Sequence, residues 1–143
     1  MMNILVHALW FSKFKGSEFS VAYNYVTEMS KKHHLYVVVE SCSYEINDLS
    51  EFSKYTIPNV EFIFVSFNRK LRFLTWLTRI FGTHYYTYVI FHEWEKRLFK
   101  QLKKSDIIPK IDLIHFLGPV GWHEIGYLYK LGKPCIWGPV GGF

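Results

Sequence analysis

The sequence predicts an α/β fold in which a parallel sheet carries helices on both of its faces. Short apolar runs recur along the 143 residues, each with the length and composition of a strand buried on both faces. Segments with helical periodicity alternate with these runs, which indicates parallel strands joined by crossover helices. Half of the residues are hydrophobic and a fifth are aromatic, which excludes an intrinsically disordered chain.

The first half of the chain supplies three predicted strands and one helix. The apolar runs NILVHALW, HLYVVVE and VEFIFVSF predict strands at residues 3–10, 34–40 and 60–67. A helix follows the polar loop FSKFKGSE, because apolar residues then recur at helical spacing on one face: Val21, Ala22, Tyr25, Val26 and Met29. The polar residues 41–58 could include a further short helix.

The second half begins with a long helical pattern over residues 69–104, broken near Gly82. One piece has an apolar face of Phe73, Leu74, Leu77, Ile80 and Phe81, and the other a face of Phe91, Trp94, Leu98 and Leu102. IDLIHF and KPCIW predict the last two strands, at 111–116 and 133–137. Between them, GWHEIGYLYKLG predicts a short helix ending at Gly132. The whole chain, residues 1–143, is expected to form one domain with a Rossmann-like sheet.

The two cysteines and the apolar runs bear on where the protein resides. Cys135 falls within a predicted strand and is expected to be a buried thiol, and Cys42 offers no disulfide framework with it, so a reducing cytoplasm fits. The apolar run near the N-terminus follows no positive charge and is short for a signal peptide. No stretch reaches about eighteen uncharged residues, so we expect a soluble protein, or one peripheral on the inner face of the cytoplasmic membrane.

The positive charge of the chain is concentrated in one segment. The net charge is +5, and residues 69–104 hold nine Lys and Arg against two Glu. Aromatic residues are interleaved with them, so this segment predicts either a solvated basic face or a surface for anionic lipids. A nucleic-acid surface is a third alternative, but we expect no nucleic acid among the partners. The membrane-facing candidates are Arg69, Lys70, Arg72, Trp76, Arg79, Lys96, Arg97 and Lys100.

Ligands of open parallel sheets bind outside the carboxyl ends of the strands, so the loops there hold the candidate site residues. Gly16, Ser17 and Glu18 open the first helix, where a glycine and free amides can approach an anionic group. The alternative is a plain helix cap, with Ser17 as N-cap and Glu18 offsetting the helix dipole.

Two further candidates follow the fourth predicted strand. His115 lies near its carboxyl end, where an imidazole could bond a substrate hydroxyl or transfer a proton, or could instead be a core histidine with both nitrogens satisfied. His123 and Glu124 begin the next helix and could bind a polar ligand or form a solvated first turn. No metal site is expected, because His33-His34 and His92-Glu93 lack the spacing of a zinc motif.

The Gly-Pro-Val-Gly sequence occurs twice, at 118–121 and at 138–141. In the second copy, Gly141 and Gly142 let backbone amides approach a ligand or adopt positive φ, although a turn at a domain boundary would also place glycines there.

Together these motifs resemble the N-terminal domain of bacterial family 4 glycosyltransferases, which have the GT-B fold. GSEFSVAYNYVTEMSKKHHLYVVVE is similar to the family's Gly-Ser-Glu loop, first helix and second strand. IDLIHFLGPVGWHEIGYLYKLGKPCIWGPVGG is similar to its strand–histidine–loop–helix–strand unit, which ends in Gly-Pro-Ile/Val-Gly-Gly. The resemblance covers nearly the whole chain and is weakest from about residue 43 to 104.

The resemblance implies transfer of a sugar from a nucleotide sugar to an acceptor hydroxyl, with retention at the anomeric carbon. In such enzymes the N-terminal domain mainly holds the acceptor, here a glycan or lipid-linked acceptor of surface-polysaccharide synthesis, and a C-terminal domain mainly holds the donor. Gly16 and Ser17 match the loop near the donor phosphates, His115 a histidine facing the cleft, and Gly141 and Gly142 the loop at the domain boundary. No cofactor is implied beyond the nucleotide sugar as substrate.

The chain departs from the family at three points. His123-Glu124-Ile125-Gly126 replaces a usual Arg-Glu-Pro-Gly, and Leu117 stands where some branches carry a second cleft histidine. The donor-binding domain is absent from these 143 residues. We therefore expect an acceptor-side half that is inactive alone, completed by a separate donor-binding domain or chain as in a split enzyme. A non-catalytic peripheral membrane module is the alternative.

Overall fold

The computed structural model describes residues 1–16, 18–40, 56–82, 85–118 and 125–139. Five parallel strands form one sheet in the order β3-β2-β1-β4-β5. The strands are β1 (Asn3–Leu9), β2 (His34–Glu40), β3 (Val60–Val65), β4 (Leu113–Phe116) and β5 (Cys135–Trp137). The α-helices are α1 (Glu18–Met29), α3 (Arg69–Phe81) and α4 (Tyr85–Lys103), and two 3-10 helices are η1 (Ile108–Lys110) and η2 (Leu128–Leu131). The Rossmann-like α/β prediction is confirmed.

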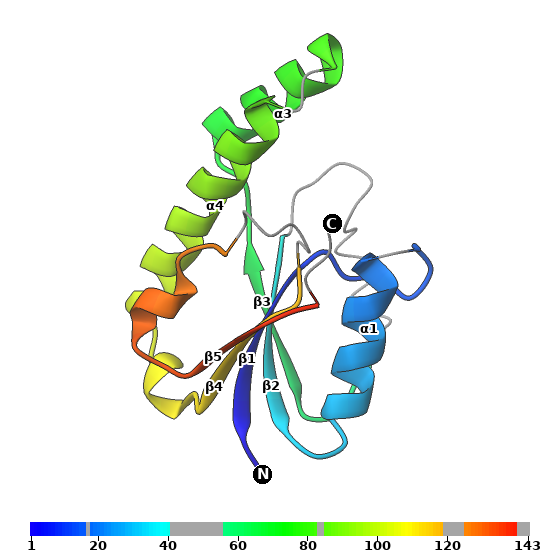
Figure 1. Ribbon diagram of the computed structural model, residues 1–143, viewed down its shortest axis with the longest axis vertical. Helices are drawn as coiled ribbons and strands as arrows, with labels where there is room; N and C mark the ends of the chain where they lie inside the picture. Colours follow the sequence, from blue (N-terminus) through cyan, green and yellow to red (C-terminus); the bar gives the residue numbers. More distant parts are fainter. Residues whose placement is uncertain (17, 41–55, 83–84, 119–124, 140–143) are drawn as a thin grey trace.

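Helices cover both faces of the sheet, as Figure 1 shows with α1 on one side and α4 on the other. The alternation of β1 explains the two layers, because successive side chains of a strand point to opposite faces. Leu5 joins a core with Trp94 and Leu98 of α4. Val6 joins a second core with Ala22 and Val26 of α1. The face predicted for the helix at 91–102 is therefore confirmed.

The basic segment forms a helical hairpin, α3 and α4, whose tip extends beyond the body of the molecule. Asn68 caps the start of α3 by accepting a hydrogen bond from the amide of Leu71 at 2.8 Å. Gly82 ends the helix in the left-handed conformation, so the predicted break is confirmed. In Figure 1, α3 and the first turns of α4 extend past the carboxyl ends of the strands.

Two expectations from the sequence are wrong at the β5 side of the sheet. Cys135 is exposed rather than buried, because β5 pairs only with β4 within the described sheet and lies at its edge. The predicted helix over 121–132 is not an α-helix in its described part, where only η2 is helical. Gly126 has φ +63°, a value that interrupts a right-handed helix, while Gly132 does end η2 as expected.

The expected apolar face of α3 is also corrected. Phe73, Ile80 and Phe81 are exposed, whereas Leu71 is buried and Leu74 packs against the core. Periodicity identifies an apolar face but not the neighbour that covers it. Here α3 packs beside α4 and extends beyond the sheet, so only one side of the helix meets the protein.

Candidate functional site

The strand order creates a switch point between β1 and β4. The chain runs from β1 to β2 and β3 on one side, and β4 then pairs with the other side of β1. The loops that leave the carboxyl ends of β1 and β4 therefore go to opposite faces, and the crevice between such loops is the usual ligand site of an open parallel sheet. The candidate site is built around this point.

The end of β1 has an unusual backbone. Leu9 is a buried non-glycine residue with φ +50°, and the amide of Trp10 donates a hydrogen bond to the carbonyl of Ala8. This three-residue turn is a γ-turn with positive φ at its centre, a strained form. The register with β2 shifts at the same place. Such strain is concentrated at functional sites, and here it lies at the switch point.

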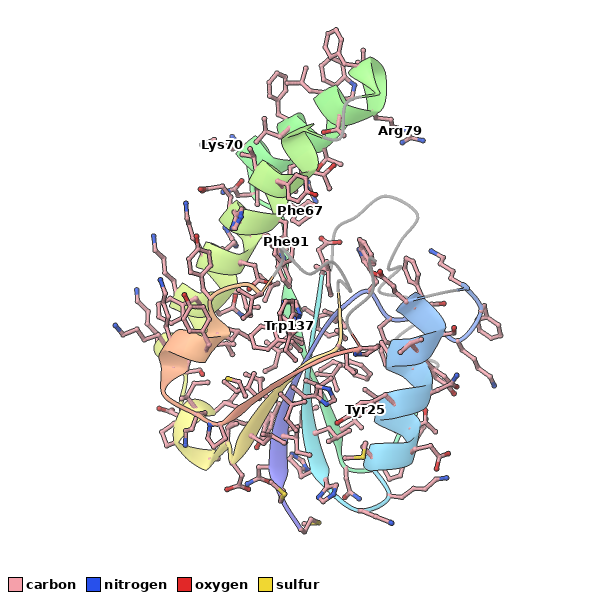
Figure 2. The ribbon with its side chains drawn as sticks, in the orientation of Figure 1. Tyr25, Phe67, Lys70, Arg79, Phe91 and Trp137 are labelled. Atoms are coloured by element: carbon pink, nitrogen blue, oxygen red, sulfur yellow. The ribbon has the colours of Figure 1, made fainter. Side chains whose placement is uncertain are left out.

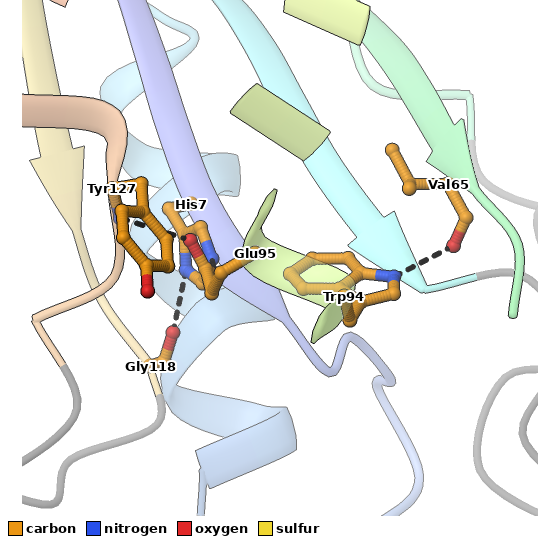
Figure 3. A network of polar contacts seen from close by, with 6 residues as sticks. All are labelled: His7, Val65, Trp94, Glu95, Gly118 and Tyr127. Atoms are coloured by element: carbon orange, nitrogen blue, oxygen red, sulfur yellow. Dashed lines mark hydrogen bonds and ion pairs between the residues drawn. The ribbon is translucent and has the colours of Figure 1, made fainter. Parts of the chain in front are cut away.

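A buried histidine and a buried glutamate meet beneath this turn (Figure 3). His7 of β1 and Glu95 of α4 are both fully buried, and Nε2 of His7 contacts Oε1 of Glu95. Nδ1 of His7 lies 2.6 Å from the carbonyl oxygen of Gly118, which follows β4. The imidazole therefore joins the central strand, the helix behind it and the loop after β4.

The proton positions in this pair follow from the partners. A carbonyl oxygen can only accept, so Nδ1 of His7 carries a proton and donates it to Gly118. Burial alone would lower the pKa of His7, but the charge of Glu95 and the hydrogen bonds to Glu95 and Gly118 raise it above its ordinary value of 6.5. The pair is therefore best described as an imidazolium beside a carboxylate.

The same carboxylate holds the far end of the loop after β4. The amide of Tyr127 donates to Oε2 of Glu95 at 3.4 Å. Gly126 packs so closely that a Cβ on it would come within 2.8 Å of the Glu95 carboxyl carbon. Gly118 and Gly126 thus fix the two ends of a segment whose residues 119–124, including His123 and Glu124, lie outside the described residues.

His115 is half-buried in β4 and both of its nitrogens have protein partners. Nδ1 lies 2.6 Å from the hydroxyl of Tyr25 in α1, and Nε2 lies 3.0 Å from the carbonyl oxygen of Gly138. Since a carbonyl only accepts, Nε2 carries the proton, and neutral Nδ1 accepts from Tyr25. Burial lowers the pKa of His115, against a smaller opposing effect of the Gly138 bond, so the neutral form is favoured.

The remaining substrate-binding candidates are only partly described. Gly16 is exposed, and a Cβ there would meet no atom within 4 Å, so the present backbone does not require glycine for space. Glu18 begins α1 and is partly buried. Ser17, His123, Glu124, Gly141 and Gly142 lie outside the described residues.

The membrane-facing candidates all lie on the hairpin and are exposed: Arg69, Lys70, Arg72, Trp76 and Arg79 on α3, and Lys96, Arg97 and Lys100 on α4. Lys96 pairs with Glu93 at 2.7 Å, and Lys96, Lys70 and Lys100 together lower the pKa of that carboxyl. Figure 2 shows Lys70 and Arg79 on α3, away from the sheet.

Two further geometric findings concern the described residues. None of their helices is both long enough and apolar enough to cross a bilayer. No three of their His, Cys, Asp and Glu side chains come together in the manner of a metal site.

No protein-family model matches the chain, and none of the curated proteins matches it.

Sequence reasoning missed His7 and Glu95, which are both fully buried near the switch point. Signals for both were present. His7 is the one polar side chain inside the apolar run of residues 4–9, and Glu95 lies four residues after Phe91, on the same helical face. A charge on a core face indicates a buried partner.

Proposed function

We propose that this chain is the acceptor-side half of a retaining glycosyltransferase, which transfers a sugar from a nucleotide sugar to a glycan or lipid-linked acceptor. The observation that carries the proposal is the β3-β2-β1-β4-β5 order, which puts a switch point, the usual ligand site of such sheets, at the same end as the motifs similar to the family. His115 lies one residue before the end of β4. The loop with Gly16 and Glu18 leaves the neighbouring β1.

In this proposal His115 binds the acceptor. Its neutral imidazole and the hydroxyl of Tyr25 form a hydrogen-bonded pair that can exchange one protein partner for a sugar hydroxyl. The lowered pKa of His115 keeps Nδ1 an acceptor near neutral pH. The nucleotide sugar takes most of its contacts from a donor-binding domain, as the resemblance implies.

Nuclear magnetic resonance of the labelled 143-residue chain tests the proposal. Adding a panel of short-chain lipid-linked glycans should shift the signals of His115 and Tyr25, and nucleotide sugars should shift them little. His115→Gln and Tyr25→Phe should weaken acceptor binding, while Lys31→Gln, in an exposed pair with Glu28, should leave it unchanged. The absence of shifts with every glycan, or turnover of a nucleotide sugar by this chain alone, would contradict the assignment.

A second candidate function is a non-catalytic peripheral membrane module. The exposed apolar and basic residues of α3 favour a membrane partner under either proposal. Sedimentation with anionic and neutral liposomes tests the shared part, and equal binding to both would count against an electrostatic membrane face. Glycan-dependent shifts at His115 would then favour the transferase over the module.

A further inference from the structure

Helix α3 carries two separate apolar faces. Leu71 and Leu74 face the protein: the first is buried, and the second packs against the core. Phe73, Trp76 and Ile80 follow one another at intervals of three and four residues, so they form a second stripe along the helix. Their exposed fractions are 57%, 52% and 54%. A surface helix ordinarily turns its apolar stripe to the core, and this stripe does the opposite.

Cations flank the exposed stripe. Arg72 and Arg79 lie one turn before and one turn after Trp76, and both are exposed. Helix α3 contains no carboxylate. The outward face of α3 therefore carries exposed apolar side chains with exposed arginines beside them.

The position of this face favours a flat partner. In Figures 1 and 2 the hairpin projects beyond the carboxyl ends of the strands, and Lys70 and Arg79 lie along α3 away from the sheet. Phe81 at the end of α3 and Tyr88 and Val89 on α4 extend the exposed apolar surface. Peptides are usually bound in a groove, whereas an exposed helix face with apolar and basic residues can lie in a membrane interface. A projecting hairpin therefore suits a bilayer better than a peptide.

We infer that α3 lies in the interface of an anionic bilayer, with the side chains of Phe73, Trp76 and Ile80 inserted at the boundary of headgroups and acyl chains. Arg72 and Arg79 then contact lipid phosphates beside Trp76. The inference deepens the membrane association proposed above and rests on it. It adds a binding mode: shallow insertion of one helix face, where the sequence predicted only a basic and aromatic surface for anionic lipids.

This orientation has a consequence for the candidate site. The hairpin projects from the same end of the sheet as the switch point between β1 and β4. A bilayer that holds α3 would therefore lie at the end of the sheet that carries the switch point. A lipid-linked acceptor held in that bilayer would approach the molecule from the end of β4 near which His115 lies.

Depth-dependent fluorescence quenching of the full chain tests the insertion. Of the tryptophans that the structure describes, only Trp76 is classed as exposed. Vesicles of phosphatidylcholine and phosphatidylglycerol with bromine on the upper acyl chain should quench the wild-type emission and shift it to the blue. Trp76→Phe should still bind but lose most of the quenching and the shift. Equal quenching of wild type and Trp76→Phe would overturn the inference.

A matched set of serine variants tests the stripe itself by vesicle sedimentation. Phe73→Ser, Trp76→Ser and Ile80→Ser combined should weaken partitioning about tenfold or more, because the interfacial apolar contact is lost. The control combines Val21→Ser, Tyr129→Ser and Ile136→Ser, which have exposed fractions of 42%, 47% and 49% on other elements. It should bind like wild type, and equal weakening in both sets would overturn the inference.

The arginines provide an independent test. Arg72→Gln with Arg79→Gln should weaken binding roughly tenfold on anionic vesicles and little on neutral ones. Lys31→Gln with Lys32→Gln, at the end of α1, removes the same charge elsewhere and should have a smaller effect. Wild-type chain that ignores vesicles but binds RNA would overturn both the insertion and the membrane association. Glycan-induced shifts of the His115 signals do not depend on vesicle binding. The transferase proposal is therefore tested separately from the membrane insertion.

Discussion

Gly126 shows how one residue constrains the buried centre of this protein. Its φ of +63° already disfavours a side chain, and a Cβ would press into the Glu95 carboxylate that holds His7 and the amide of Tyr127. Gly132 is a natural comparison, since its φ is +72° but the space around it is open. Substitutions at the two glycines can therefore separate the free-energy cost of a strained backbone from the free-energy cost of disturbing a buried charge pair.

We expect Gly126→Ala to lower the free energy of unfolding by about 3 kcal/mol or more, because the strained backbone and the displaced buried carboxylate both contribute. Gly132→Ala should cost about 1 kcal/mol, the backbone part alone. Urea unfolding followed by circular dichroism measures both. Equal losses in the two variants would show that Glu95 moves aside without cost.

The buried pair also predicts a pH dependence. The pKa of His7 is raised above 6.5, so the pair stabilises the fold fully below that pH, and the stabilisation is lost as pH rises through the folded pKa. In Glu95→Gln the charge that raises the pKa of His7 is absent, and burial then lowers this pKa. The contribution of His7 to the pH dependence of the free energy of unfolding should therefore reverse sign. Urea unfolding from pH 5.5 to 9 measures the difference between the two proteins. Parallel pH profiles would contradict the ion pair.

His115 is predicted to be the neutral Nε2–H tautomer. Gly138 accepts from Nε2, and Tyr25 donates to Nδ1. Long-range ¹H–¹⁵N spectra distinguish a protonated from an unprotonated ring nitrogen and should show Nδ1 unprotonated at pH 7. Because the pKa is lowered, the contribution of His115 to stability should be lost as pH falls below about 6.5. A spectrum with Nδ1 protonated would contradict these hydrogen bonds.

At the scale of elements, β5 and α3 differ from their sequence patterns for the same reason. Both are apolar runs that ordinarily predict burial, yet β5 is an edge strand and α3 extends past the sheet. What covers an element is decided by the topology, which the local pattern does not contain. Phe73 and Cys135 therefore looked like core positions and are exposed.

The edge position of β5 gives a simple chemical test. In a Cys42→Ser variant, the thiol of Cys135 should react with a disulfide reagent in the folded protein, without denaturant. Partial burial raises the pKa of this thiol, so the rate should increase as pH is raised from 7 to 9. A thiol that reacts only after unfolding would place β5 in the interior.

The pairing of His7 with Glu95 marks the limit of sequence reasoning at this scale. Strands and helices were predicted because buried parallel strands are continuously apolar and α4 has a regular apolar face. The partners of the buried pair are 88 residues apart, and their contact depends on which face of α4 meets β1. The positive φ of Gly126 likewise has no signal that distinguishes it from a glycine inside a helix.

Over the whole molecule, the sheet and its two covered faces were predictable, whereas the hairpin's projection and the switch-point contacts were not. The former follow from binary patterns repeated in every strand. The latter depend on packing between elements that are distant in sequence, such as β1 and the loop after β4.

The central place of β1 also affects how the protein folds during synthesis. This strand leaves the ribosome well before its neighbour β4, and the carbonyl of Gly118 comes 111 residues after His7. At about 5–20 residues per second, β1 has one unpaired edge for roughly 5–20 s. During that interval an apolar strand with an uncompensated histidine is open to incorrect partners. The nascent chain therefore depends most on chaperones until β4 has been translated and can pair with β1.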